Sequence, residues 1–197
     1  MEKNRLEAFS DGVLAIIITI MVLELKVPHG SDLAALKPLL PVFLSYVLSF
    51  IYVGIYWNNH HHLLKAAPRA TAGIMWSNLH LLFWLSLFPF VTGWMGENHF
   101  TTLPSAVYGV VLFLAAIAYY ILQNRVIAVA GNNSQLAQSL GRDWKGKLSP
   151  VLYATGIAAS CFRPWLAWSI YVFVALMWLI PDRRLARVVE PERFHTR

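Results

Sequence analysis

The stretch Arg5-Leu6-Glu7-Ala8-Phe9-Ser10-Asp11-Gly12 opens a segment that then runs apolar from Val13 to Leu23. Together with these opening residues, the segment from Arg5 to Leu25 reaches the roughly 20 residues that a helix needs to cross a bilayer. An arginine and an aspartate at the mouth of such a helix are costly, and charges in this position mark candidate functional sites that need polar partners. The stretch therefore predicts a membrane helix whose first turns are engaged by polar residues from elsewhere in the chain.

The composition of the whole chain agrees with a membrane protein. Of its 197 residues, 57% are hydrophobic and 13% are charged, whereas about 25% of the residues in soluble domains are charged. We expect one membrane domain over residues 1–182 and a charged cytoplasmic tail over residues 183–197. The net charge of +6 is explained by membrane topology, so no nucleic-acid partner is expected. Cys161 is the single cysteine, which excludes an intrachain disulfide.

Six apolar segments predict an all-α protein with six transmembrane helices. The segments cover residues 5–25, 38–64, 73–95, 103–130, 148–162 and 165–180. Pro89 lies inside the third segment and should kink it, because proline removes a backbone hydrogen bond. Arg163 and Pro164 leave only a tight turn between the last two segments, which we expect to form a hairpin. A single interrupted, re-entrant element is the alternative for this part of the chain.

The basic residues orient these helices, because cytoplasmic loops of membrane proteins are enriched in lysine and arginine. With the N-terminus in the cytoplasm, 13 of the 16 basic residues fall on the cytoplasmic side, and only Lys26, Lys37 and Arg163 fall on the outer side. After six crossings the C-terminus returns to the cytoplasm as well.

The first segment offers one face that could line a pore. Successive helical residues are about 100° apart, which places a set of residues within about 60° of Ile16, namely Arg5, Phe9, Gly12, Thr19, Ile20 and Leu23. Asp11 and Ser10 lie on the two flanks of this face. Around a common axis, Ile16, Ile20 and Leu23 would form stacked apolar rings, which can gate or select ions. Packing against lipid or another helix is the alternative, because every face of the segment is apolar.

The densest polar cluster near a membrane segment is Tyr56-Trp57-Asn58-Asn59-His60-His61-His62. The topology places it at the cytoplasmic end of the second helix, level with Asp11 and with Asn78 in the third helix. We expect a hydrogen-bonded network of Asp11, Ser10, a histidine (His60 or His61) and Asn78, because polar groups are costly to leave unpaired in lipid.

Other chemistries suit these residues less well. His60 and His61 are adjacent and point about 100° apart, whereas zinc-binding histidines on helices are spaced i, i+4. Hydrolysis by Ser10 would need an oxyanion hole, for which the sequence offers no candidate. We therefore expect no metal, no cofactor and no enzymatic activity. A proton-coupled transporter that uses Asp11 and the second-helix histidines, and a histidine-metal membrane enzyme, stay open as alternatives.

The pattern Arg5-x-x-x-Phe9-Ser10-Asp11, with the apolar residues that follow up to Leu25, resembles the first-helix signature of the transmembrane protein 175 potassium channel family. The similarity continues in Trp57-Asn58-Asn59-His60-His61, Trp76-Ser77-Asn78 and Ser86-Leu87-Phe88-Pro89-Phe90. The length of six helices is similar to the prokaryotic branch with one repeat, whereas the animal members carry two repeats.

The resemblance implies a homotetramer with a central pore lined by the first helix. It implies an apolar constriction at Ile16, Ile20 and Leu23, with Thr19 as the neighbour that contributes to selectivity. The family motif would be structural, and its residues are Arg5, Phe9, Ser10 and Asp11, with Trp57, His60, His61 and Asn78 as network partners. The implied function is a potassium-permeable channel for K⁺ and other monovalent cations in the bilayer of a bacterial plasma membrane, with modest K⁺ over Na⁺ selectivity and no cofactor.

Overall fold

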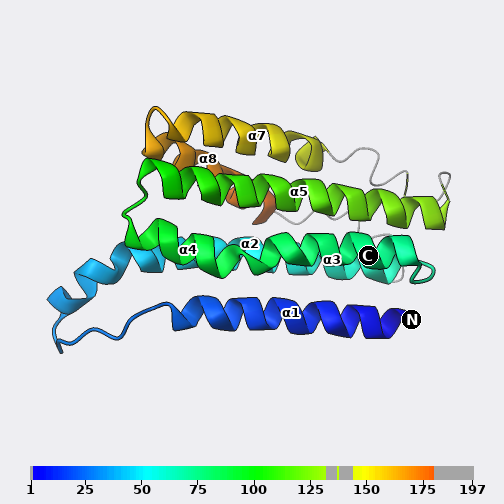
Figure 1. Cartoon of the computed structure of the whole chain (residues 1–197), viewed down its shortest axis with the longest axis horizontal. Coiled ribbons are helices and arrows are strands. Elements are labelled where there is room, and N and C mark those ends of the chain that lie inside the picture. Colours follow the sequence, from blue (N-terminus) through cyan, green and yellow to red (C-terminus); the bar gives the residue numbers. More distant parts are fainter. Residues whose placement is uncertain (1, 132–136, 138–143, 180–197) are drawn as a thin grey trace, which may run out of the picture.

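All regular elements in the described part of the chain are helices (Figure 1). The computed structural model describes residues 2–131, 137 and 144–179. The elements are α1 (Lys3–Leu23), the 3-10 helix η1 (Leu33–Leu39), α2 (Leu40–Ala66), α3 (Ala72–Ser86), α4 (Phe88–Glu97), α5 (Thr102–Ala130), α7 (Trp144–Ser160) and α8 (Pro164–Leu179). The predicted all-α class is confirmed, and the predicted tail over residues 183–197 lies outside the described residues.

The eight elements given above correspond to the six predicted segments when η1 is counted with α2 and α3 is counted with α4. Four units are long and apolar enough to cross a membrane, namely Lys3–Leu23, Leu33–Ala66, Ala72–Glu97 and Thr102–Ala130. The remaining two helices, α7 and α8, have 17 and 16 residues, somewhat fewer than the roughly 20 of a typical span. Which ends face the cytoplasm stays a prediction.

The third predicted segment is divided into two helices, as its proline suggested. α3 ends at Ser86, α4 begins at Phe88, and Pro89 lies in the first turn of α4. The first amides of a helix have no partner within the helix, so proline is tolerated there. The break therefore falls at Leu87, before the proline, where the missing amide costs least.

The second predicted segment begins differently from the expectation. Its start at Pro38 falls inside η1, and α2 begins only at Leu40. Asp32 caps η1, because its Oδ1 accepts a hydrogen bond from the Ala35 amide at 3.1 Å. A polar capping residue of this type is a strong start signal that sequence reasoning passed over.

The last two helices form the predicted hairpin. The turn is closed by short backbone hydrogen bonds, among them Arg163 N to Ala159 O at 2.9 Å. Tyr171 of α8 lies so close to Gly156 of α7 and Gly109 of α5 that a Cβ on either glycine would overlap its ring or hydroxyl. These two glycines are therefore required by the packing of α8.

The helices pack as an elongated bundle with α1 at one edge. α1 packs against α2, α3 and α4, whereas α5, α7 and α8 lie beyond them on the other side (Figure 1). Large buried aromatic side chains fill the centre, with Tyr52, Phe88, Tyr108 and Tyr171 each no more than 1% exposed. Among the described residues, α1 is thus held on one side only, and its other side is largely uncovered.

Candidate functional site

One face of α1 is buried against the rest of the bundle. Its residues, each at most 3% exposed, are Leu6, Ser10, Leu14, Ile17 and Met21. Their spacing of three or four residues places them on one stripe of the helix. We call this stripe the packed face.

The opposite side of α1 carries large apolar side chains with little cover. The exposed fraction is 59% for Ile16, 42% for Ile20, 75% for Leu23 and 50% for Phe9, and Thr19 is exposed as well. We call these five residues the open face. The structure thus brings Ile16, Ile20, Leu23 and Thr19 together on one side, as the helical angles predict, and turns that side away from the bundle.

Ser10 joins the packed face to two other helices through buried hydrogen bonds. The Asn78 Nδ2 of α3 donates to Ser10 Oγ at 2.9 Å, and Asn78 Oδ1 lies 2.6 Å from His60 Nε2 of α2. All three side chains are at most 1% exposed. Because an amide oxygen only accepts, His60 must carry its proton on Nε2 in this arrangement.

Asp11 has a different partner from the one expected. The Trp57 Nε1 of α2 donates to Asp11 Oδ1 at 3.0 Å, so the predicted pairing of Asp11 with His60 or His61 is wrong. His60 points instead to Asn78, and His61 stacks on Trp57 with ring centroids 6.2 Å apart. The physical reason is the 100° step between neighbours, which sends adjacent histidines in different directions.

We use the name polar clamp for the polar residues through which α1 contacts α2 and α3, namely Ser10, Asp11, Trp57, His60 and Asn78. Two successive residues of α1 are tied in it to two different helices, Ser10 to α3 and Asp11 to α2. Two anchors in different directions fix the rotation of α1 about its own axis. The clamp therefore determines which side chains of α1 form the open face.

The other two motif residues lie outside this clamp. Arg5 is exposed and its side chain makes no hydrogen bond or ion pair with the residues that the structure describes, and Phe9 belongs to the open face. Lys3, which the motif did not single out, fastens the start of α1 instead. Its Nζ donates to the Lys65 carbonyl at 2.6 Å and lies 3.8 Å from Glu7 Oε1.

A metal centre finds no support in the described ranges. Within residues 2–131, 137 and 144–179, no three histidine, cysteine, aspartate or glutamate side chains gather so that they could hold a metal ion. His60 is buried against Asn78, whereas His61 lies beside the Trp57 ring. The two adjacent histidines thus contact different residues.

The part of the chain that carries the clamp and the open face matches a known family. The family model described as "Endosomal/lysosomal potassium channel TMEM175" matches residues 5–89. A protein named as a potassium channel of Chryseobacterium sp. (strain P1-3) is 57% identical over 187 residues, which cover 95% of this chain and 97% of that protein. The endosomal/lysosomal proton channel TMEM175 of Gallus gallus is 40% identical over 83 residues, which are 36% of this chain and 17% of that protein.

The fold is similar to a solved structure over nearly its full length. The crystal structure of a lysosomal potassium-selective channel TMEM175 homolog from Chamaesiphon minutus aligns with a TM-score of 0.79 and 27% sequence identity, covering 90% of this chain and 96% of that chain. The high identity to a relative of the same length and the shared fold agree with the first-helix motif. The chain belongs to the TMEM175 family of ion channels and is not an enzyme.

Proposed function

We propose that the protein is a passive, potassium-permeable cation channel of a bacterial plasma membrane, built as a homotetramer around a central pore lined by α1. The open face is the observation that carries this proposal. Its apolar side chains Ile16, Ile20 and Leu23 are left largely uncovered by the described part of the subunit, although the helix is firmly held on its packed face. Four copies around an axis would turn these side chains into stacked rings over two helical turns.

The open face also supports a specific view of ion selection. The chain contains no Thr-Val-Gly-Tyr-Gly stretch from which a ring of backbone carbonyls is built in other potassium channels. Thr19 Oγ1 donates to the Ala15 carbonyl at 2.9 Å, which leaves the lone pairs of the hydroxyl oxygen free to accept. Apolar rings remove ion hydration without replacing it, so we expect Thr19 to offer the one side-chain oxygen of the constriction and the K⁺ over Na⁺ preference to be modest.

The polar clamp acts in this proposal as a positioning device. A rotation of α1 by about 100° would exchange Ile16 for Ile17 at the pore axis. Ser10 and Asp11 resist such a rotation because they are bonded to α3 and α2. The clamp residues would therefore influence ions only through the orientation of α1.

The proton-coupled transporter receives less support from the same geometry. The indole N–H of Trp57 donates but cannot accept, so the bond between Trp57 and Asp11 cannot pass a proton onward. The bond of His60 ends on the Asn78 amide, which is also a poor proton carrier. Asp11 and the histidine are thus held in separate contacts rather than in one relay.

The test is ion flux in liposomes that contain the purified protein. Ile16→Asn and Leu23→Ala change two of the proposed rings, and we expect each to alter K⁺ flux or the ratio of K⁺ to Na⁺ flux. Leu176 in α8 is 55% exposed, so Leu176→Asn and Leu176→Ala are matched controls that should leave both quantities unchanged. If neither α1 variant changes flux or selectivity, or if the controls change them equally, the pore assignment is wrong.

A further inference from the structure

Two polar side chains of the membrane helices point away from the bundle, Asn58 in α2 and His80 in α3. Both residues are exposed, although both lie inside units that are long and apolar enough to cross a membrane. Each lies eight residues, or about 12 Å, from the end of its helix at the turn that joins α2 to α3. Polar side chains within a membrane span almost always face protein or water rather than lipid. The surroundings of these two residues therefore need an explanation other than lipid.

His80 has one hydrogen-bonding atom left without a partner among the described residues. The Trp84 indole donates to His80 Nε2 at 3.0 Å. Because Nε2 accepts, the neutral ring carries its proton on Nδ1, and this N–H has no acceptor in the described part of the chain. A donor of this kind is costly to leave unpaired in lipid. His80 thus needs an acceptor that the described residues do not supply.

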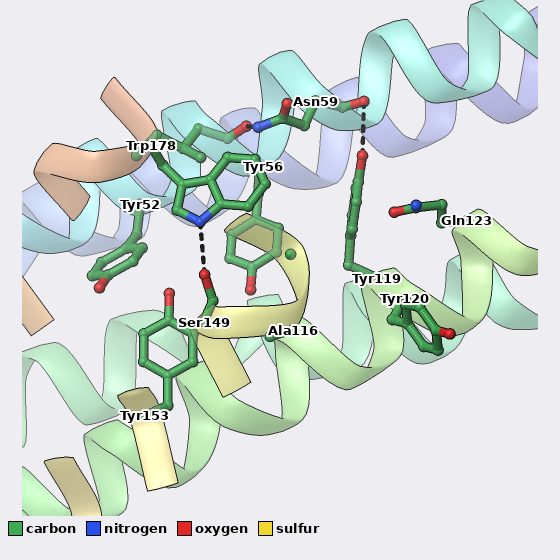
Figure 2. A pocket seen from close by; sticks show the side chains of 12 residues that line it. Tyr52, Tyr56, Asn59, Ala116, Tyr119, Tyr120, Gln123, Ser149, Tyr153 and Trp178 are labelled. Atoms are coloured by element: carbon green, nitrogen blue, oxygen red, sulfur yellow. Dashed lines mark hydrogen bonds between the residues drawn. The ribbon is translucent and has the colours of Figure 1, made fainter. Parts of the chain in front are cut away.

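Asn58 carries a free acceptor of the required kind. Its side-chain amide makes no hydrogen bond with a described residue, whereas the adjacent Asn59 is well paired. Asn59 Nδ2 donates to the Ile55 carbonyl at 2.9 Å, and the Asn59 carbonyl accepts from the Tyr119 hydroxyl at 3.2 Å, as Figure 2 shows. The unpaired Oδ1 of Asn58 is therefore a suitable acceptor for an imidazole N–H.

The bond between His60 and Asn78 relates the positions of the two unpaired groups. α2 and α3 run in opposite directions (Figure 1), and this bond sets His60 and Asn78 at one depth. Asn58 precedes His60 by two residues and His80 follows Asn78 by two, so both lie about 3 Å farther from the joining turn. Two residues also turn a helix by about 200°. Asn58 and His80 therefore lie at equal depth and point to opposite sides of the subunit.

These two sides flank the open face of α1. Ser10 and Asp11 lie on the two flanks of that face and are bonded to α3 and to α2, respectively. In a ring of copies around the open face, the outer side of α3 in one copy therefore meets the outer side of α2 in the next. Cyclic assemblies of more than two copies join two different surfaces in this way.

We propose that His80 of one copy donates through Nδ1 to Asn58 Oδ1 of the neighbouring copy, and that this contact recurs around the homotetramer. The partner of these two surfaces is thus a second copy of the chain. Exposed apolar side chains lie on the same surfaces, Trp76 and Phe83 beside His80 and Val47 beside Asn58, and they pack in the same interface. The inference rests on the proposed ring of copies around α1 and not on ion conduction.

Cross-linking of the full chain in liposomes tests the contact. In a Cys161→Ser background, which removes the single native cysteine, the protein with Asn58→Cys and His80→Cys is treated with a short bis-methanethiosulfonate reagent and separated on a denaturing gel. We expect cross-linked species of up to four chains, and none when only one of the two cysteines is present. The matched control pairs His80→Cys with Phe173→Cys, because Phe173 is exposed on α8, beyond the helices that contact α1. This control should give no cross-linked species.

Substitution tests the hydrogen bond itself. Asn58→Leu and His80→Phe should each weaken the association of copies in detergent by about two- to tenfold per contact, because one hydrogen bond is lost. The double variant should lose no more than either single variant, because both substitutions remove the same bond. Light scattering measures the association. If the two side chains faced lipid, the apolar replacements would leave association unchanged or strengthen it, and the contact would be overturned.

The cross-linking outcomes separate the contact from the channel. The contact would be overturned by the absence of cross-linked species, by a product that stops at two chains, or by equal cross-linking in the single-cysteine or control proteins. Species of up to four chains in a protein that conducts no K⁺ would support the contact and contradict the proposed function. K⁺ flux without cross-linked species would contradict the contact alone.

Discussion

The two faces of α1 have nearly the same composition but opposite surroundings. Each carries four large apolar side chains and one hydroxyl, Ser10 on the packed face and Thr19 on the open face. The Ser10 hydroxyl accepts a hydrogen bond from another helix, whereas the Thr19 hydroxyl donates only to its own helix at Ala15. Apolar content therefore does not distinguish the face that packs, whereas the polar contacts of Ser10 with α3 and of Asp11 with α2 do.

Removal of the amide at the centre of the clamp should have the largest effect. Asn78→Ala leaves His60 Nε2 buried without a partner, whereas Ser10 Oγ loses one hydrogen bond and keeps the one that it donates to the Leu6 carbonyl. One unpaired buried group costs about 1–3 kcal/mol and one lost hydrogen bond about 0.5–1.5 kcal/mol, so the free energy of unfolding should fall by about 1.5–4.5 kcal/mol. Thermal or denaturant unfolding in detergent measures this change.

Asn98→Ala is the matched control for that loss. Asn98 is exposed and its amide donates only to the Trp94 carbonyl within its own helix, so we expect a change below about 1 kcal/mol. Equal losses in the two variants would show that the clamp does not hold α1.

Adjacent isoleucines on the two faces provide a direct comparison. Ile17 is 3% exposed and Ile16 is 59% exposed. Ile17→Ala leaves a cavity in the core and should lower the free energy of unfolding by about 2–4 kcal/mol, with K⁺ over Na⁺ preference retained. Ile16→Ala should cost less stability and should change the flux ratio. Unfolding and liposome flux measure the two effects. If Ile16→Ala lowered the free energy of unfolding more and Ile17→Ala changed the flux ratio, the roles of the two faces would be exchanged.

Much of the fold follows from the sequence, because long apolar runs and proline act locally. The six segments and the hairpin at Arg163 and Pro164 were predicted, and so was an interruption of the third helix near Pro89. The predicted network of Ser10, a histidine and Asn78 indicated the orientation of α1, whereas the apolar pattern did not, since all faces of this helix are apolar. The orientation depends on where Ser10 meets Asn78, and the relative register of α1 and α3 is not encoded in local spacing.

The sequence predicted which residues belong to the candidate site better than it predicted which of them are hydrogen-bonded to each other. Ser10, Asp11, Trp57, His60 and Asn78 all belong to motifs visible in the sequence, but the histidine partner assigned to Asp11 was wrong. A row of polar residues at a helix end points in several directions, so the sequence shows which groups need partners and not which partners they find.

For stability and for K⁺ flux, the charge of Asp11 should matter less than its hydrogen bond. Asp11→Asn keeps an oxygen that can accept from the Trp57 indole, so we expect a stability change below about 1 kcal/mol and K⁺ flux with an unchanged dependence on pH. Asp11→Leu removes the acceptor and should lower stability further. Loss of transport in a folded Asp11→Asn protein would favour the proton-coupled alternative.

The smallest effect on stability is expected from an ion pair that lies beyond the last turn of α1. Lys26 Nζ lies 2.7 Å from Glu97 Oε1 at the end of α4, and the hydrogen bond and charge of Glu97 raise the pKa of Lys26 above its usual 10.5. A raised lysine pKa stabilises the fold below the unfolded pKa, and this contribution is lost as the pH rises through the folded pKa.

Thermal unfolding from about pH 9 to about pH 11.5 should therefore show a slight loss of stability that Glu97→Gln removes. The loss should be slight because both side chains are largely exposed, at 77% and 50%. A large loss that persists in the Glu97→Gln variant would assign the pH dependence to other groups.

Cysteine modification tests whether the open face of α1 lines the ion pathway. In a Cys161→Ser background, which removes the single native cysteine, Leu23→Cys on the open face is compared with Met21→Cys on the packed face. Liposome K⁺ flux is measured before and after treatment with a cationic methanethiosulfonate reagent. We predict that the reagent reduces flux through the Leu23→Cys protein and leaves flux through the Met21→Cys protein unchanged. Unchanged flux through Leu23→Cys, or an equal reduction in both proteins, would show that the open face does not line the ion pathway.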